Sequence, residues 1–365
     1  MSRPAVLFGG PSPEHDVSIL TGLQAARALG DAHAIYWEKG GDLAFYAVEP
    51  TLEGSDFVDG RPPKAQRLKL DVGGGPGGFS TEGRRAKALD VACVVNCCHG
   101  GPGEDGTLQA ALDLAGLRYT GPSVASAALG MDKLAFAAAV TAAGLPHLPC
   151  TAAKPEASRP PFDGPYIVKP RFGGSSIGIE VFESWDDVVA YVGSPQPTLR
   201  AGGAVVEPYV KGADDLEVAI RRHPELQLSE LSRPLKTEGA IYDYRKKYVP
   251  GEGMAAAERE LPAQLPAAMA DAARDAARQL ADVAMVRGVA RLDFLVADDA
   301  LYVNEINTVP GSLAKHLWEA SGLPFAQLLR DMVAEATAGP GRAFPTQGAD
   351  GSILRSAAAI ASKLG

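Results

Sequence analysis

Cysteine is scarce in this sequence, and the four that occur lack the spacing of a metal site. They are Cys93, Cys97, Cys98 and Cys150, and none belongs to the paired Cys-x-x-Cys motifs that bind zinc. Three of them lie in or beside the apolar run VACVVNCC, which favours buried thiols. We therefore expect neither disulfides nor structural zinc, and a protein of the reducing cytoplasm.

The sequence also lacks long apolar runs and an excess of basic residues. No stretch of about 18 apolar residues occurs, and the N-terminus MSRPAVLFGG becomes polar too early for a secretory signal. Lys and Arg number 35 against 44 Asp and Glu, so the net charge is −9. We expect no membrane span and no general binding to nucleic acid, although a few lysines and backbone amides suffice to bind an anion locally.

Two common nucleotide-binding signatures are missing as well. The chain has no GxGxxG fingerprint, which argues against a dinucleotide-dependent enzyme, and no Walker A sequence. The glycine-rich stretch VGGGPGG at 72–78 is not followed by a clear helix that could offer amide donors to a phosphate. We interpret that stretch as a connector.

What the sequence does contain is an alternation of strand and helix patterns. In the first third, the predicted strands are 4–8, 32–37 and 88–97, and the predicted helices are 17–29 and 107–116. This alternation indicates a parallel α/β layer. Near residue 122 the pattern changes to Ala-rich helices and strands joined by long loops. The length of 365 residues is typical of two or three domains.

The strongest chemical signal is the strand pair RLDFLV and LYVNEINTVPG. Residues two apart on a strand share a face, so Arg291 lies with Asp293, and Glu305 lies with Asn307. If the hairpin loop has three residues, 298–300, Asp293 stands directly opposite Glu305. Asp293, Glu305 and Asn307 offer only oxygen ligands, which magnesium prefers. We therefore favour a metal site over the alternative, a solvated face on which these residues only form salt bridges.

A second signal is YIVKPRFGGSSIGI, in which Lys169 ends an apolar strand ahead of a Gly-Ser loop. Glycines let backbone amides approach a phosphate, and Lys169 adds a point charge. By itself this pattern is more often a flexible hairpin. Lys133, in the sequence MDK, is equally ambiguous alone. The interpretation of Lys169 and Lys133 as phosphate contacts is strengthened by the nearby metal site, because such a site would need a polyphosphate partner.

Two loops follow predicted parallel strands and carry a third signal. They are GGPSPEHDVS, with Glu14, and HGGPGEDGT, with His99. Ligands of α/β sheets collect at the carboxyl ends of the strands, so both residues are placed for a small substrate. A single Glu or His in a loop is, however, more often solvated surface.

From about residue 4 to 332 the chain resembles the D-alanine–D-alanine ligase family of the ATP-grasp superfamily. The matching motifs, in order, are FGGPSPEHDVS, HGGPGEDGTLQ, YTGPS, MDK, VKPRFGGSSIGI, YDYRKKY, RLDF and NEINTVPG. The resemblance implies an α/β (α+β) ATP-grasp fold whose domains enclose a nucleotide. The segments it predicts are a substrate domain (1–122), a central subdomain with a Gly-Ser lid (123–210), a C-terminal subdomain with the metal site (211–337), and a linker with a terminal helix (338–365).

The resemblance also assigns roles to single residues. On the substrate side, Glu14 holds the amino group of the first D-alanine, His99 lines that subsite, Ser175 and Tyr248 form a hydrogen-bonded trio with Glu14, and Arg291 steadies an oxyanion. On the nucleotide side, Lys133, Lys169 and Lys247 contact phosphates, Glu207 receives the adenine amino group and Asp215 binds the ribose. Asp293, Glu305 and Asn307 hold two magnesium ions, for which manganese is an alternative.

The segment PGSLAKHLW departs from the family pattern. Where the family places a serine for the carboxylate of the second D-alanine, this chain has His316, preceded by Lys315. The second-substrate residues are therefore taken to be Gly311, Lys315 and His316, with Ser312 as a possible contributor. As a cationic pair, Lys315 and His316 could bind the carboxylate of the second D-alanine, or they could fit a different second substrate.

The sequence thus leads to two enzymatic hypotheses. The first is an ADP-forming ligase that joins two D-alanines through an acyl phosphate for peptidoglycan synthesis. The alternative is a related carboxylate–amine ligase with another amino or hydroxy acid as acceptor. A catalytically silent ATP-binding protein is disfavoured because none of the metal and phosphate residues is missing. The partners expected from the resemblance are ATP, small amino acids and a second copy of the chain in a homodimer.

Overall fold

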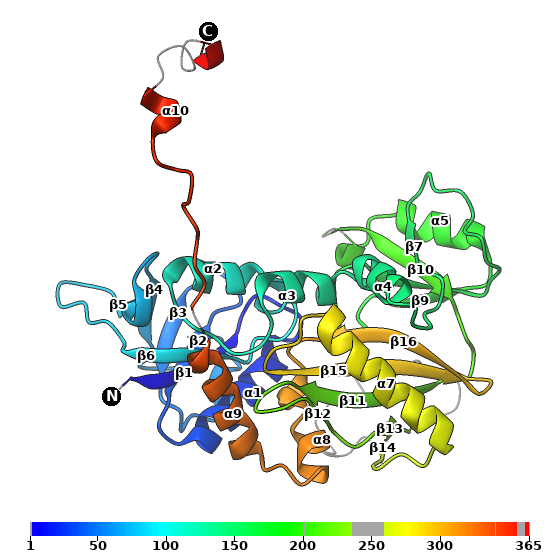
Figure 1. Ribbon diagram of the computed structural model, residues 1–365, viewed down its shortest axis with the longest axis horizontal. Coiled ribbons are helices and arrows are strands. Elements are labelled where there is room, and N and C mark those ends of the chain that lie inside the picture. Colours follow the sequence, from blue (N-terminus) through cyan, green and yellow to red (C-terminus); the bar gives the residue numbers. More distant parts are fainter. Residues whose placement is uncertain (1, 200–201, 236–258, 340, 356–361, 365) are drawn as a thin grey trace.

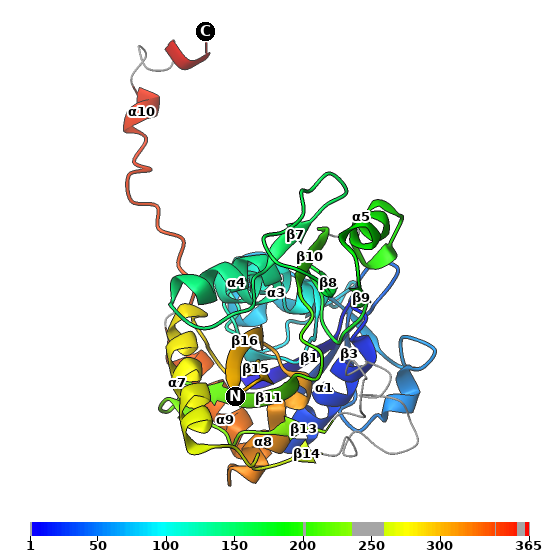
Figure 2. The same cartoon turned by 90° about the vertical axis from the view of Figure 1, so that its right-hand side faces the viewer.

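The computed structural model describes residues 2–199, 202–235, 259–339, 341–355 and 362–364, and every structural statement below refers to these residues. Figure 1 shows an N-terminal body in blue and cyan, a central body in green, and a C-terminal sheet in green and orange. Residues 341–355, including α10 (Ser352–Arg355), extend away from the rest, and Figure 2 shows the same from the side. No helix within the described ranges has the length and apolar content needed to cross a membrane.

The N-terminal body is built on a six-stranded sheet with the order β5-β4-β3-β2-β1-β6. Its strands are β1 (Arg3–Gly9), β2 (His33–Trp37), β3 (Phe45–Val48), β4 (Gln66–Leu70), β5 (Phe79–Thr81) and β6 (Val91–Asn96). Only β6, β1 and β2 are parallel, as predicted for the whole layer; β3, β4 and β5 pair antiparallel. The loop from β2 to β3 is too short for a helical crossover, so the chain has to return antiparallel.

Helices complete this body and carry the predicted loops. They are α1 (His15–Leu29) and α2 (Thr107–Ala115), with the single 3₁₀ turns η1 (Gly54–Phe57), η2 (Gly75–Gly77) and η3 (Gly101–Gly103). The predicted helices 17–29 and 107–116 are thereby confirmed to within a few residues. Gly116 ends α2 in the left-handed conformation, with φ 74°, that glycine adopts without strain.

The central body is a small antiparallel sheet with one helix. Its order is β7-β10-β8-β9. The elements are β7 (Thr151–Ala153), β8 (Tyr166–Pro170), β9 (Glu180–Phe182), β10 (Ala204–Pro208), α5 (Trp185–Gly193) and η4 (Pro197–Leu199). Six buried residues form its core: Ala153, Tyr166, Val168, Val188, Ala204 and Val206. The predicted strands on both sides of the Gly-Ser loop are thus present.

The third body is a sheet of order β12-β11-β15-β16 covered by helices. Its elements are α3 (Val124–Met131), α4 (Lys133–Ala142), β11 (Asp214–Arg221), β12 (Gln227–Leu228), α7 (Ala267–Val283), β15 (Val289–Ala297) and β16 (Ala300–Asn307), beside a two-stranded ribbon of β13 (Arg233–Pro234) and β14 (Arg259–Glu260). Phe136 and Val140 of α4 pack into the core under this sheet. Although α4 precedes the central sheet in sequence, its apolar face therefore belongs to the third body.

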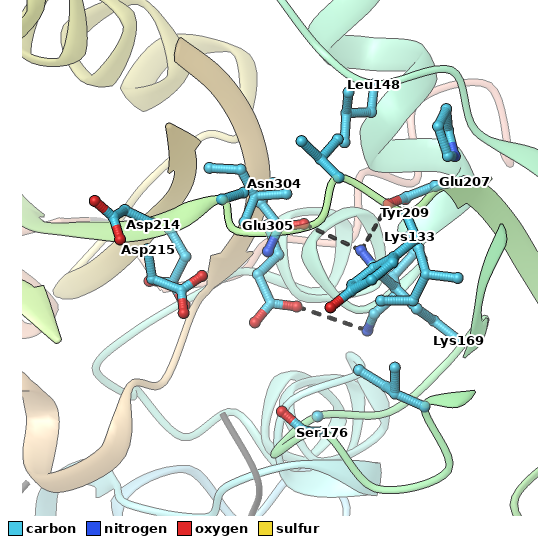
Figure 3. A pocket seen from close by; sticks show the side chains of 18 of the residues that line it. Lys133, Leu148, Lys169, Ser176, Glu207, Tyr209, Asp214, Asp215, Asn304 and Glu305 are labelled. Atoms are coloured by element: carbon cyan, nitrogen blue, oxygen red, sulfur yellow. Dashed lines mark hydrogen bonds and ion pairs between the residues drawn. The ribbon is translucent and has the colours of Figure 1, made fainter. Parts of the chain in front are cut away.

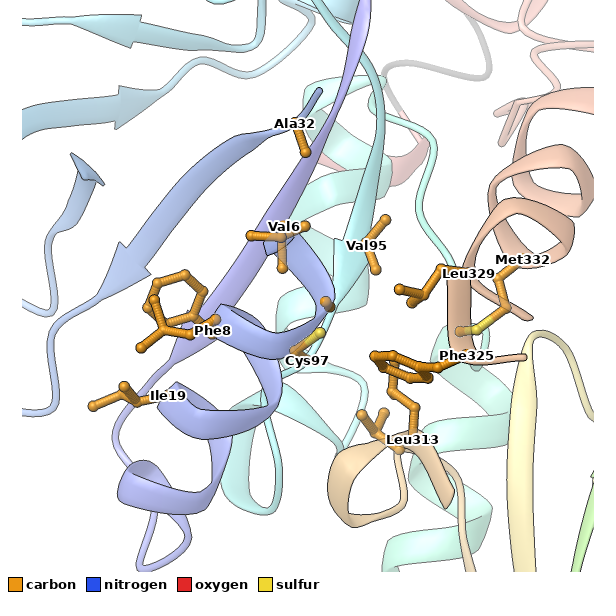
Figure 4. Packing of buried hydrophobic residues seen from close by; sticks show 14 of the residues in the cluster. Val6, Phe8, Ile19, Ala32, Val95, Cys97, Leu313, Phe325, Leu329 and Met332 are labelled. Atoms are coloured by element: carbon orange, nitrogen blue, oxygen red, sulfur yellow. The ribbon is translucent and has the colours of Figure 1, made fainter. Parts of the chain in front are cut away.

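The chain then returns to the N-terminal body. After β16 it forms η5 (Gly311–Ala314), α8 (Lys315–Ala320) and α9 (Phe325–Ala338). Leu313, Phe325 and Met332 pack with Val6 and Val95 of the N-terminal sheet in one continuous core, which Figure 4 shows. This packing fixes the turn at residues 308–314 against the first body.

The hairpin of β15 and β16 brings Asp293 opposite Glu305, as predicted, but by a different route. The predicted three-residue loop is wrong. The tip has two residues, Asp298 and Asp299, at φ 47° and 62°, and a β-bulge at Asn304 restores the register. Continued from this tip without a break, the register would set Asn304 opposite Asp293; the bulge leaves Asn304 unpaired, and Glu305 takes the place opposite Asp293 instead.

Candidate active site

A cavity of about 750 Å³ lies between the central sheet and the C-terminal sheet. This volume suits a bound small molecule, since ligand pockets measure roughly 300–1,000 Å³. The cavity brings together many of the residues singled out in the sequence: Lys133, Lys169, Ser175, Glu207, Asp215, Asp293 and Glu305. Figure 3 shows several of these side chains converging from different elements.

Two lysines form the centre of the cavity. Lys169, at the end of β8, donates to Glu207 Oε2 at 2.6 Å and to Asn304 Oδ1 at 3.1 Å. Lys133, at the start of α4, donates to the carbonyl of Gly173 at 2.5 Å and lies 3.8 Å from Glu305 Oε2. Both ammonium groups point inward in Figure 3. The two ammonium groups thus place positive charge in the middle of the cavity, next to the carboxylates of Glu207 and Glu305.

The charge state of Lys169 follows from its surroundings. Burial disfavours the ammonium form, but the adjacent carboxylate of Glu207 more than offsets this effect, so the pKa of Lys169 is raised. Lys169 is 6% exposed and Glu207 is 4% exposed. A charge held at this depth is strongly attracted to an incoming phosphate, because little water is present to screen it.

The predicted metal face lies at the other end of the cavity. Arg291 donates to both carboxylate oxygens of Asp293, at 2.6 and 2.7 Å, and Asn307 Nδ2 donates to Asp293 Oδ2 at 3.1 Å. Glu217 pairs with Asp293 across β11 and β15 and lies 3.8 Å from Arg291. Burial raises the pKa of Asp293 to about 7, although Arg291 opposes the rise. The carboxylates of this face therefore need positive charge near them.

Within the described ranges, no three His, Cys, Asp or Glu side chains already surround a common point for a metal. The predicted set nevertheless fits a hard cation. Asp293, Glu305 and Asn307 offer only oxygen ligands and lie on two adjacent strands, with Asp293 directly opposite Glu305. Asp293 already has one cationic partner, Arg291, whose Nε lies 2.6 Å from Asp293 Oδ1.

The donor side joins the first body to the Gly-Ser loop. Ser175 Oγ donates a hydrogen bond to Glu14 Oε1, so two members of the predicted trio are in contact. Ser175 and Ser176 have φ values of 54° and 59°, a left-handed conformation that serine adopts only where surrounding contacts hold it. Tyr248 and Lys247 lie outside the described residues.

His99 is close to this region, but its ring is turned into the protein. It is 2% exposed; Nδ1 lies 2.7 Å from the carbonyl of Val309 and Nε2 lies 2.8 Å from Thr21 Oγ1. Burial lowers the pKa of His99, an effect that Glu14 partly opposes. Both ring nitrogens are thus occupied by protein groups.

The two basic residues of PGSLAKHLW point to different partners. Lys315 Nζ lies 3.8 Å from Glu319 and 5.5 Å from the ring centroid of Phe325. His316 Nε2 lies 2.7 Å from Arg259 Nη1. Burial, together with Arg259, lowers the pKa of His316 to about 4, so the ring is neutral near pH 7. The structure therefore does not bring Lys315 and His316 together as a cationic pair, whereas Gly311 begins η5 next to them.

Several site residues were not found from the sequence. Glu217 could have been, because it lies two residues after Asp215 on a strand and so shares its face. Asn304 could not, because only the bulge turns it toward Lys169. Arg259 could not have been found either, because no motif or residue spacing in the sequence relates it to its partners. The fold brings it into contact with His316 and within 3.4 Å of Glu217.

Comparison with known proteins adds family information to this geometry. Residues 3–122 match the family model "D-ala D-ala ligase N-terminus", and residues 130–334 match "D-ala D-ala ligase C-terminus". The chain is 33% identical to the D-alanine–D-alanine ligase of Bradyrhizobium sp. (strain ORS 278), over 92% of the chain and 95% of that protein. It is 31% identical to the ligase of the same name from Rhodococcus opacus (strain B4), over 92% and 97%.

Solved structures of low sequence identity share the fold. The D-alanine–D-alanine ligase from Coxiella burnetii superposes with a TM-score of 0.75 at 22% identity, over 92% of this chain and 94% of that one. VanG D-Ala:D-Ser ligase from Enterococcus faecalis gives a TM-score of 0.71 at 22% identity, over 92% and 99%. The predicted fold class is thereby confirmed.

Proposed function

Because the chain belongs to the D-alanine–D-alanine ligase family, we propose that it joins two D-alanines into D-alanyl-D-alanine at the expense of ATP, for cell-wall synthesis. The observation that carries this proposal is the identity of 33% to a named ligase over 92% of the chain. It is supported by a cavity in which two inward-pointing lysines face a set of carboxylates. The enzyme is an ATP-dependent ligase.

The nucleotide would occupy the cavity with its phosphates at Lys133 and Lys169. Glu207, in the apolar strand β10, would then exchange its contact with Lys169 for the adenine amino group, and Asp215 would bind the ribose. Lys247, outside the described residues, would reach the transferred phosphate. Asp293, Glu305 and Asn307 would hold the metal, proposed as two Mg²⁺ ions with Mn²⁺ as an alternative. When bound, the metal supplies positive charge that offsets the charge of the phosphates.

The reaction proceeds in two steps at these groups. The carboxylate of the first D-alanine, held through its amino group at Glu14, attacks the γ-phosphorus, so that ADP leaves and an acyl phosphate forms. The amine of the second D-alanine, whose ammonium proton has passed to solvent, then attacks the acyl carbon, and the surplus proton on the nitrogen leaves with the phosphate. Arg291 and the backbone after Pro310 stabilise the oxyanion, and phosphate leaves. The contact of Ser175 with Glu14 holds the Gly-Ser loop over the reactants and helps exclude water.

The acceptor carboxylate would be bound by Arg259, with His316 as the residue that orients it. The neutral ring of His316 accepts from Arg259 Nη1 and leaves the positive charge on the guanidinium. Arg259 pairs with Pro234 across β13 and β14, and Pro234 lines the cavity. The arginine thus lies beside the edge of the cavity next to Glu217.

Replacing Arg259 with leucine should therefore raise the KM for the second D-alanine by about tenfold to a hundredfold. A hydrogen bond to a charged group contributes about 1.5–3 kcal/mol, and 1.4 kcal/mol corresponds to about a factor of ten. The KM for ATP should stay close to that of the unchanged enzyme. Arg278→Leu, which removes an exposed arginine from α7, is the matched control. An unchanged KM for the acceptor in Arg259→Leu would remove Arg259 from the subsite.

The experiment that tests the function is ADP release with ATP, Mg²⁺ and D-alanine alone, combined with mass spectrometry of the product. We expect ADP together with D-alanyl-D-alanine. A second candidate is favoured by the histidine in PGSLAKHLW: a ligase with another amino or hydroxy acid as acceptor. ADP that forms only after such an acid is added would support that candidate against the first. We also propose a cytoplasmic homodimer, which light scattering of the purified protein would test.

A further inference from the structure

A buried chain of hydrogen bonds joins three segments that are far apart in the sequence. Thr21 lies in α1, His99 and Glu104 belong to the loop after β6, and residues 308–312 follow β16. His99 bridges Thr21 Oγ1, at 2.8 Å, and the carbonyl of Val309, at 2.7 Å. Ser312 N donates to Thr21 Oγ1 at 3.1 Å. The first body thus contacts the turn after β16 through side chains as well as through the apolar core.

The direction of each bond follows from its groups. The carbonyl of Val309 can only accept, so Nδ1 of His99 carries the hydrogen. Burial keeps the ring neutral, and Nε2 consequently accepts from the hydroxyl of Thr21. The hydroxyl oxygen of Thr21 in turn accepts from Ser312 N–H. The chain of donors therefore runs from Ser312 through Thr21 and His99 to Val309.

Glu104 holds the same turn from a second direction. Its Oε1 accepts from Val309 N–H at 2.8 Å, and its Oε2 accepts from Gly100 N–H at 3.0 Å. Both backbone groups of Val309 are therefore bound by side chains of a single loop. Glu104 is only 7% exposed, so its carboxyl group would be costly to bury without these partners.

The turn that receives these bonds requires outside support. Ser312, Leu313 and Ala314 have φ values of 48°, 52° and 54°, which residues with a side chain adopt at an energetic cost. The loop that provides the support also touches the donor subsite. A Cβ at Gly100 would lie 2.5 Å from Glu14 Oε2. The loop thus runs between Glu14 on one side and the strained turn on the other.

We propose that Thr21, His99 and Glu104 form a clamp that positions the backbone after Pro310 relative to the donor subsite, and so sets the direction from which the second substrate attacks the acyl carbon. This inference rests on the proposed function. The three side chains act through the turn, so they are positioning residues. They also give His99 and Glu104 of HGGPGEDGT one shared task.

The test is a set of threonine variants. Thr21→Val keeps the shape of the side chain and removes the hydroxyl, and Thr21→Ser keeps the hydroxyl. Thr141→Val is the matched control, because the hydroxyl of Thr141 donates within its own helix α4, to the carbonyl of Ala137. In Thr21→Val we expect kcat/KM for the second D-alanine to fall on the order of tenfold, with the KM for ATP within about twofold of the unchanged enzyme. Thr21→Ser should restore most of the loss.

Amide hydrogen exchange supplies a readout that does not depend on activity. Ser312 N–H should exchange faster in Thr21→Val than in the unchanged chain, while exchange in β1 and β6 stays the same. If the unchanged enzyme makes no dipeptide, the proposed function fails and exchange still tests the clamp. Unchanged exchange at Ser312, or an equal loss toward ATP and the acceptor, would overturn the clamp. Should Thr21→Val not fold, Glu104→Gln provides the same comparison, because glutamine has one acceptor oxygen in place of two and so loses the bond from either Gly100 N–H or Val309 N–H.

Discussion

Glu305→Ala is expected to lower turnover by on the order of a thousandfold or more while the protein stays folded. The variant removes one of two opposed carboxylates from the proposed metal set, and a metal contributes several kcal/mol of charge stabilisation to such a reaction. The side chain of Glu305 is 31% exposed, so its loss leaves no closed apolar cavity. The measurement is ADP release at saturating ATP and D-alanine, together with thermal unfolding.

The matched control for this prediction is Asp299→Asn, which removes an exposed negative charge at the tip of the same hairpin and keeps a side chain that tolerates φ 62°. It should change neither turnover nor unfolding. If Glu305→Ala kept its activity, the assignment of Asp293, Glu305 and Asn307 to the metal would be wrong. If it lost its fold as well, the loss of turnover would carry no information about the metal, and Glu305→Gln would replace it.

Lys169→Met should both abolish turnover and destabilise the protein. Lys169 and Glu207 form an ion pair at 2.6 Å and are buried together. Removing one partner leaves an uncompensated buried charge, which costs about 3–5 kcal/mol of unfolding free energy. The lysine is also one of the three lysines proposed to contact the phosphates. Urea unfolding and ATP turnover measure the two effects separately.

The double variant Lys169→Met/Glu207→Gln separates these effects. Since it also removes the stranded charge, its stability should recover toward that of the unchanged protein, whereas its turnover should stay lost. Lys154→Met, an exposed lysine of the central body, is the control and should alter neither quantity. The absence of any recovery in the double variant would show that Lys169 stabilises the fold through groups other than Glu207.

Local periodicity explains which parts of the fold the sequence could predict. The run YIVKP, the helix at 107–116 and the strands that carry Asp293 and Glu305 all have patterns that depend on near neighbours alone. The antiparallel half of the first sheet and the packing of α4 under the third sheet depend on where the chain returns. Local sequence patterns do not indicate which distant strands or sheets a segment will pack against, so neither feature could be predicted.

The candidate site divides in the same way. The predicted residues that line the cavity were identified because each lies at a position that matches the family resemblance. Arg259 and Asn304 enter only through tertiary structure, one across a ribbon and the other at a bulge. For Lys315 and His316 the sequence predicted a shared cationic role, whereas the fold directs one to Glu319 and makes the other a neutral acceptor for Arg259. The roles proposed for the individual site residues stay predictions.

The bulge at Asn304 has a consequence for engineering this chain. The bulge leaves one residue of β16 unpaired and lies between the hairpin tip and the pair Asp293–Glu305. The residues of the tip can therefore vary without changing that pair. Asp298 and Asp299 are exposed, and exposed tips of small polar residues are where proteins accept inserted sequence. A fluorescent label or an affinity epitope grafted between these two aspartates should leave the pairing of Asp293 with Glu305 in place.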